Sequence, residues 1–175
     1  MAARRQDAAK GFFGWQVVGA AFVLAVLTWG INFYGPSVYL HALHAREGWP
    51  LSLISAAITL HFLASAAVVA RLSALLARFG PVAVTRAGMA AAALGVAGWG
   101  NAAAPWHLAP AALLTAVGWA LTSGAAINSL VSQWFDRRRP AALAMAYNGA
   151  SAGGIVFTPL WAALIAAWGY GAASL

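Results

Sequence analysis

The sequence predicts an all-α, polytopic membrane protein with five transmembrane helices. Of its 175 residues, 63% are hydrophobic and only 7% are charged, whereas about a quarter of the residues in a soluble domain are charged. The mean hydropathy is +0.78. The apolar residues occur in runs of about 20 residues or more, long enough to cross a hydrocarbon core of about 30 Å. We therefore expect a lipid bilayer to surround most of this protein.

The charge balance and the residue types exclude several functions. Ten Lys and Arg residues outnumber three Asp and Glu residues, but they are spread between apolar runs, so we expect no nucleic acid partner. Cysteine is absent, which excludes disulfides, thiolate metal sites and a cysteine nucleophile. No phosphate-binding loop, metal-binding helix motif or pair of catalytic carboxylates occurs. We expect no enzymatic activity, no metal site and no cofactor.

The first span follows a short basic tail. Residues 1–13 form this predicted cytoplasmic tail, and an apolar run begins at Gly14. A cleaved signal peptide begins similarly, but the run reaches about residue 35, which favours an uncleaved membrane helix. Pro36 either ends or kinks that helix. Trp49, in the polar loop that follows, has the position of an interfacial aromatic anchor.

Short polar or proline-containing turns separate the remaining spans. Turns are expected around Gly80, around Pro105 and at the charged run 136–139. The five spans are then expected at about residues 14–35, 51–72, 82–103, 108–134 and 140–168.

The basic residues predict the orientation, because Lys and Arg are retained on the cytoplasmic side. With the N-terminus inside, one residue, Arg46, falls outside. The others all fall inside: Arg4, Arg5, Lys10, Arg71, Arg78, Arg86, Arg137, Arg138 and Arg139. Arg86, about a turn into its span, is expected to snorkel to that surface. We predict a multi-pass protein of the plasma membrane, or of the bacterial inner membrane, with a cytoplasmic N-terminus.

Small residues mark one side of the fifth span. Ala142, Ala146, Ala150 and Gly154 recur at every fourth position, and Gly149 and Gly153 form a second pair. Such a face lets another helix approach closely and gain dispersion contacts. We expect Gly149, Gly153 and Gly154 to pack against another helix.

Three segments resemble one transporter family. Residues 134–154 (WFDRRRPAALAMAYNGASAGG) resemble the signature that leads into the fifth helix of the monocarboxylate-transporter and oxalate/formate-antiporter branch of the major facilitator superfamily. Residues 12–18 (FFGWQVV) resemble the opening of that branch's first helix, without the acidic residue that often precedes it. Residues 73–81 (SALLARFGP) resemble the superfamily's loop motif but carry Ala77 in place of its aspartate.

The resemblance implies a fold and a function. Members have two six-helix halves, so residues 14–175 correspond to a truncated N-terminal bundle, an incomplete six-helix half that lacks its C-terminal half. Residues 169–175 resemble the start of a sixth helix. The implied function is secondary active transport of a small organic anion, a mono- or dicarboxylate, by alternating access, with a coupling ion. The implied cytoplasmic-loop residues are Arg78, Gly80, Arg137, Arg138 and Arg139.

The resemblance also implies which polar residues line the substrate cavity. The family's first, second, fourth and fifth helices do so, which indicates Asn32, Tyr34, His61, Asn128 and Asn148. An interhelical hydrogen bond is the alternative role for each asparagine. His61 is the one ionisable side chain deep in an apolar run; it either carries a proton or, the interpretation we favour, stays neutral and bonds a neighbouring helix.

Two alternative functions stay open. The first is efflux of drugs or other amphiphiles by another branch of the superfamily, which the nine tryptophans would suit. The second is an inactive or accessory membrane fragment without transport of its own.

Overall fold

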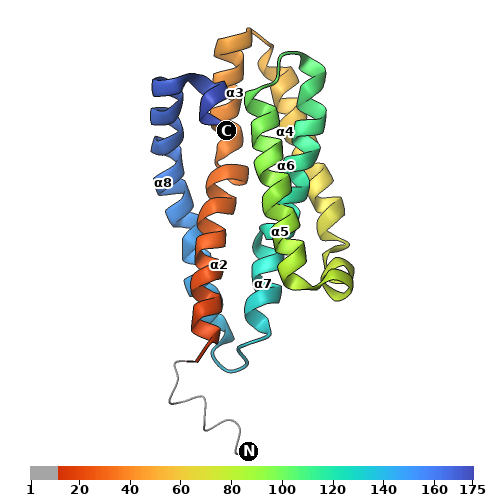
Figure 1. Cartoon of the computed structure of the whole chain (residues 1–175), viewed down its shortest axis with the longest axis vertical. Helices are drawn as coiled ribbons and strands as arrows, with labels where there is room; N and C mark the ends of the chain where they lie inside the picture. The colour runs from red at the N-terminus through yellow and green to blue at the C-terminus, as the bar shows by residue number, and fades with distance from the viewer. Residues whose placement is uncertain (1–11) are drawn as a thin grey trace, which may run out of the picture.

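The computed structural model describes residues 12–175, which form an all-helical bundle without β-strands (Figure 1). Five helical segments are long and apolar enough to cross a membrane, which confirms the five predicted spans. They are Gly14–Glu47, Leu51–Val69, Leu72–Gly100, Pro105–Ser132 and Arg139–Ala173. Arg4, Arg5 and Lys10 of the predicted tail lie outside the described residues.

The first span is longer than expected because Pro36 does not end it. It consists of α2 (Gly14–Thr28), a π-helical turn η1 (Trp29–Phe33) and α3 (Gly35–Glu47). Pro36 lies in the first turn of α3, where its missing N–H group is not needed. In η1 the Tyr34 N–H donates to the Trp29 carbonyl at 2.9 Å, and the chain continues as a helix. The span ends at Gly48, whose φ of 68° suits glycine.

The third span also begins earlier than expected. The helix α4 (Leu51–Val69) is followed almost at once by α5 (Leu72–Gly100), which contains a break at Gly80 (φ 77°, ψ 158°). The turn predicted around Gly80 is therefore this break. Residues 72–79 form a short helix before it rather than a loop, since Leu72 and Leu75 pack against Leu121 of the fourth span.

The fourth span contains a break that was not expected, whereas the fifth breaks at Gly169, one residue after its expected end. A 3₁₀ turn η2 (Pro105–His107) leads into α6 (Leu108–Thr122), and the extended residue Ser123 separates α6 from α7 (Gly124–Ser132). The helix α8 (Arg139–Ala173) breaks at Gly169 (φ 76°). The last turn then folds back over α3 and α5, where Tyr170 lies against Tyr39.

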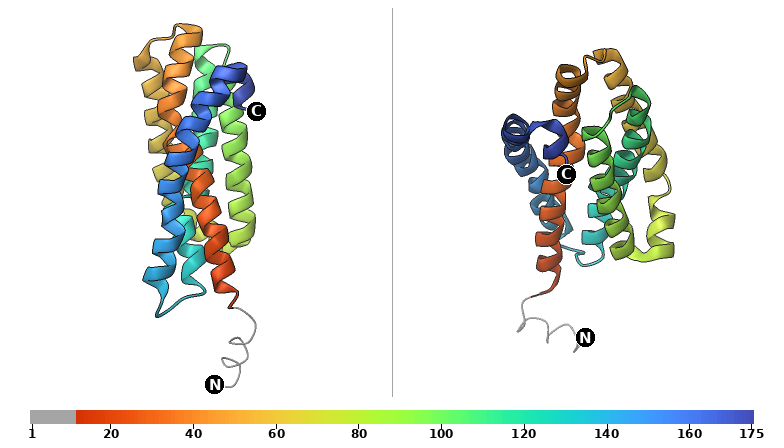
Figure 2. Two further views of the ribbon diagram at one scale, coloured as in Figure 1. Left: turned by 90° about the vertical axis from the view of Figure 1, so that its left-hand side faces the viewer. Right: turned by 45° about the horizontal axis from the view of Figure 1, so that its top comes forward.

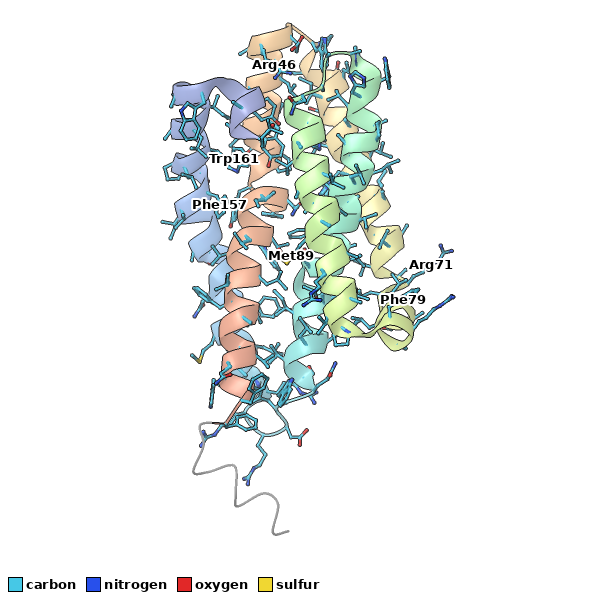
Figure 3. The ribbon with its side chains drawn as sticks, in the orientation of Figure 1. Arg46, Arg71, Phe79, Met89, Phe157 and Trp161 are labelled. Carbon is cyan, nitrogen blue, oxygen red and sulfur yellow. The ribbon has the colours of Figure 1, made fainter. Side chains whose placement is uncertain are left out.

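The spans form two groups (Figures 1 and 2). The helix α8 packs along α2, and α6 packs between α4 and α5. At the end of the bundle where α2 begins lie Arg71 and Phe79, whereas Arg46 lies at the opposite end (Figure 3). Arg78, next to Phe79, and Arg137–Arg139, between α7 and the start of α8, lie on the same side as Arg71, so the basic residues of the described chain are distributed unequally between the two ends.

Glycines allow α8 to touch the backbone of α2. A Cβ atom at Gly149 would collide with the carbonyl oxygen of Phe22, and one at Gly153 would lie 2.5 Å from that of Val26. Ala142 and Ala146 are fully buried on the same side of α8. Close backbone approach of this kind gains the dispersion contacts that hold helices together in lipid.

This seam predicts that Gly149→Val destabilises the bundle. The added side chain forces α2 and α8 apart, and overpacking of this kind costs about 1–3 kcal/mol. Thermal unfolding in detergent micelles measures the loss. Gly19→Val is the matched control, because no atom lies within 4 Å of a Cβ at Gly19 of α2. Equal melting temperatures for the two variants would contradict the role of the seam.

Candidate functional site

Four polar side chains meet where four spans cross. His61 comes from α4, Trp99 from α5, Thr115 from α6 and Asn32 from η1. The His61 Nδ1 atom lies 2.9 Å from the Thr115 hydroxyl oxygen, and the Trp99 indole N–H donates to that oxygen at 3.3 Å. Each of the four residues is at most 3% exposed. We refer to these four residues as the polar cluster.

Close packing of α5 on α6 encloses Thr115. A Cβ atom at Gly95 would lie 2.6 Å from the Thr115 backbone nitrogen, so only glycine permits this approach. Thr115 is also 3.1 Å from each of the Ala111 and Ala112 carbonyls, a usual helical back-bond. Sequence analysis did not identify Thr115 or Trp99. The small residues Gly95 and Gly118, which let α5 and α6 come into contact, were the features of the sequence that could have indicated a site here.

The cluster contains two buried acceptor atoms without a protein partner. Within residues 12–175, neither Asn32 Oδ1 nor His61 Nε2 has a hydrogen bond. Both residues line a small cavity together with Tyr39, Trp99 and Thr115. The cavity leaves about 10 Å³ for the centre of a water molecule. An organic acid, with at least three heavy atoms, does not fit in it.

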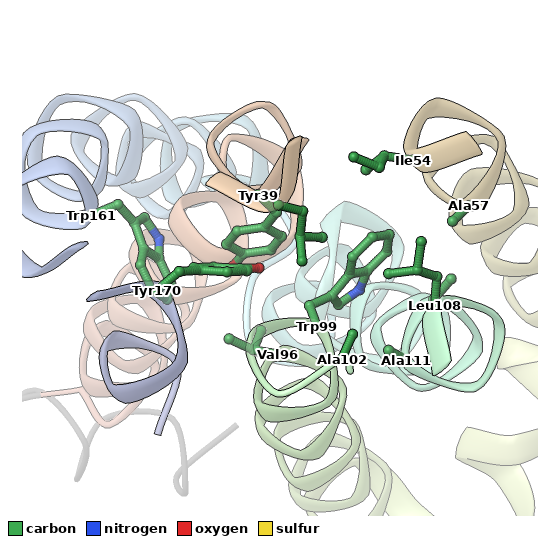
Figure 4. Packing of buried hydrophobic residues seen from close by; sticks show 12 residues of the cluster. Tyr39, Ile54, Ala57, Val96, Trp99, Ala102, Leu108, Ala111, Trp161 and Tyr170 are labelled. Atoms are coloured by element: carbon green, nitrogen blue, oxygen red, sulfur yellow. The ribbon is translucent and has the colours of Figure 1, made fainter. Parts of the chain in front are cut away.

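An aromatic layer covers the cluster on the side of α3 and the end of α8 (Figure 4). The Tyr39 ring lies 6.2 Å from Trp99, 5.4 Å from Trp161 and 5.6 Å from Tyr170, measured between centroids. The Tyr39 hydroxyl donates to the Ile31 carbonyl at 2.9 Å, and thus satisfies an acceptor in the π-helical turn. The aromatic layer is therefore joined to η1 by the hydrogen bond of Tyr39.

Arg46 ties the same end of three spans together. Its guanidinium donates to the carbonyls of Gly100 at 2.5 Å and Ala102 at 2.9 Å, and pairs with Glu47 at 2.6 Å. It also lies 5.7 Å from the ring centroid of Tyr170. Arg46 therefore connects α3 to the end of α5 and to the last turn of α8 at this end of the bundle.

The other three predicted cavity residues do not line this cavity. The half-buried Tyr34 ring lies against Gly154, 2.8 Å from where a Cβ atom would be. Asn128 is exposed and accepts a hydrogen bond from Ser132 at 3.0 Å. Asn148 is exposed on α8. The structure thus brings together Asn32 and His61 and leaves Tyr34, Asn128 and Asn148 apart from them.

Aromatic side chains from three spans form a second surface. The Trp119 ring lies 4.9 Å from Trp29 and 5.8 Å from Phe33, which in turn lies 6.5 Å from Phe62. Phe33 is 48% exposed and Phe62 is 38% exposed. We call these four residues the aromatic surface; it carries no charged side chain.

The predicted loop residues lie at the basic end. Arg78 stacks on Phe79 at 5.1 Å from the ring centroid, two residues before the break at Gly80. Arg139 begins α8, donates to the Phe135 carbonyl at 3.1 Å and lies 3.9 Å from Asp136. Arg137 and Arg138 are exposed. These positions allow the arginines to contact lipid headgroups or a partner.

A groove between α2 and α5 is apolar and has few polar lining residues. It has a volume of about 340 Å³ and is lined by residues such as Leu24 and Met89, with Arg86 as its charged lining residue (Figure 3). No group of three metal-ligating side chains occurs in residues 12–175.

The five long apolar helices of the described residues indicate an integral membrane protein. Comparison with protein-family models, curated proteins and solved structures gave no match.

The polar cluster predicts that Thr115→Val destabilises the protein. The change leaves the Trp99 N–H and His61 Nδ1 without a partner, at a cost of about 1–3 kcal/mol. Thr59→Val is the control, because Thr59 makes the same back-bond, to Ser55 at 2.9 Å, but is exposed. Thermal unfolding of both variants in detergent measures the difference, and an equal effect of the two changes would exclude a special role for Thr115.

Proposed function

We propose that the chain is the N-terminal bundle of a secondary active transporter, of the monocarboxylate-transporter and oxalate/formate-antiporter branch of the major facilitator superfamily. Its substrate is a small organic anion. One observation carries the proposal: two of the segments that resemble this branch, residues 12–18 and 134–154, contact each other. Phe135 lies 5.2 Å from Phe12 and 5.1 Å from Trp15, and Trp134 lies 5.2 Å from Phe13.

The glycines of the second segment support the same proposal. Gly149 and Gly153 lie against the backbone of α2, the helix that residues 12–18 open. Both segments therefore take part in one helix pair. In alternating access this pair moves as part of one bundle, which rocks against a second bundle around the substrate.

The distribution of charge supports a cytoplasmic N-terminus. Arg71 and Arg78 flank the short helix before Gly80, and Arg137–Arg139 lead into α8, both towards the end where α2 begins; Arg46 lies at the other end. Lys and Arg are enriched in cytoplasmic loops. With this orientation the end at which Arg46 connects α3 to α5 faces outward.

The anion requires a positive partner that the polar cluster does not supply. Asn32, His61, Trp99 and Thr115 offer hydrogen bonds but no permanent charge. An arginine or lysine of the second bundle is the expected partner, and the present bundle contributes the walls of the cavity.

The proposal predicts saturable uptake of radiolabelled small carboxylates by proteoliposomes that contain the protein as encoded at its locus. Uptake is expected to exceed that of protein-free liposomes and to be reduced by an excess of unlabelled carboxylate. The 175 residues expressed alone are the matched comparison and are expected to transport nothing, since the cavity lies between two bundles. If neither protein moves a carboxylate, transport of a small organic anion is excluded.

The aromatic surface favours a second candidate, efflux of amphiphiles. Trp29, Phe33, Phe62 and Trp119 offer an apolar, uncharged wall that suits a flat organic molecule better than a small hydrophilic acid. Release of a preloaded cationic dye from the same proteoliposomes tests it. Dye efflux without carboxylate uptake would favour this candidate, and carboxylate uptake without dye efflux would exclude it.

A further inference from the structure

Two residues that line one cavity each carry a buried acceptor atom without a protein donor. Asn32 Oδ1 in η1 and His61 Nε2 in α4 are both buried and have no partner in the described chain. The other polar atoms of the lining are already engaged: the Tyr39 hydroxyl donates to Ile31, and the Trp99 N–H donates to Thr115. A buried acceptor without a donor is destabilising, and two of them beside one cavity call for a shared donor.

The hydrogen bonds of Thr115 indicate which nitrogen of His61 carries the proton. The Thr115 oxygen accepts from Trp99, and the Ala111 and Ala112 carbonyls of its own helix lie 3.1 Å from it as acceptors. We assign its single hydrogen to this helical back-bond, which makes His61 Nδ1, 2.9 Å away, the donor to the Thr115 oxygen. The Nε2 atom of a neutral His61 is then an acceptor.

We propose that the cavity binds one water molecule, which donates one hydrogen to His61 Nε2 and the other to Asn32 Oδ1. The 10 Å³ left for the centre of a water molecule admits one water. Water also supplies two donors, the number that these acceptors need. His61 is thereby held as the neutral tautomer with its proton on Nδ1.

Within residues 12–175, no charged side chain lies against the cluster, which favours a neutral occupant over a proton or a metal cation. Tyr39 faces His61 from α3, Trp99 from α5 and Thr115 from α6, and none of them is charged. The two carboxylates of residues 12–175, Glu47 and Asp136, lie at the ends of spans and pair with Arg46 and Arg139. An imidazolium in the cavity would therefore be a buried charge without a counterion, which is costly.

The water has two consequences. It connects η1 to α4 and, through His61, to α6, so three spans of the bundle are joined by hydrogen bonds at one level. Under the proposed transport function, which this second consequence requires, His61 does not carry the coupling proton. A proton-driven carrier would then need its ionisable group outside the polar cluster.

Solid-state NMR of the full protein in lipid bilayers, labelled with ¹⁵N-histidine, tests the proposal. The chain has four histidines, and His61→Asn identifies the His61 signals. We expect a protonated Nδ1, an unprotonated Nε2 and polarisation transfer from water to Nε2. A protonated Nε2, or no transfer from water, would overturn the proposal.

Two variants at Asn32 sharpen the test. Asn32→Leu removes one acceptor and fills the cavity, so the transfer from water is expected to disappear while Nε2 stays unprotonated. Asn32→Asp supplies a counterion, and His61 is then expected to gain a second proton near neutral pH. Asn128→Leu is the control and is expected to leave the spectrum unchanged. Persistent transfer from water in Asn32→Leu would contradict the proposed site.

The spectrum is independent of transport. If carboxylate uptake fails while the His61 signals behave as expected, the transport proposal fails and the water site stands. If uptake succeeds and Nε2 is protonated, the water site fails alone.

Discussion

The closeness of the helices is the constraint on which the rest of this structure depends. Lipid is as apolar as leucine, so no hydrophobic force drives one span against another, and contact must come from dispersion and hydrogen bonds. The chain meets this condition with glycines at two seams. Gly149 and Gly153 bring α8 onto the backbone of α2, and Gly95 and Gly118 bring α5 and α6 together.

These seams determine where polar groups can lie. Once α5 and α6 touch, Thr115 is enclosed and must find its partners within the bundle, because lipid offers none. His61 and Trp99 supply two of them. On the first span the π-helical turn leaves the Ile31 carbonyl available to the hydroxyl of Tyr39. The irregular backbone of η1 and the buried polar side chains thus occur at the same level of the bundle, where the Tyr39 hydroxyl and the Ile31 carbonyl satisfy each other.

The two ends of the bundle are held by different interactions. At one end Arg46 donates to backbone carbonyls after α5, a rigid connection between α3 and the third span. At the other end aromatic rings join the start of α2 to the segment before α8, with Phe135 buried between them. The first kind of contact consists of directional hydrogen bonds, whereas the second consists of apolar ring contacts.

Hydropathy and small-residue spacing were sufficient to predict five spans, the turn at Gly80 and the packing role of Gly149, because lipid imposes the same requirement on every crossing helix. They could not place the helix ends. Pro36 is compatible with a continued helix only because η1 adjusts the backbone before it, and residues 72–79 are helical only because Leu72 and Leu75 find Leu121. The sequence singled out Asn32 and His61 as costly residues in apolar runs. That they share a cavity with Thr115 and Trp99, while Asn128 and Asn148 do not, was decided by the tertiary structure, because hydrogen bonds between spans depend on their rotation and depth, which no single span determines alone.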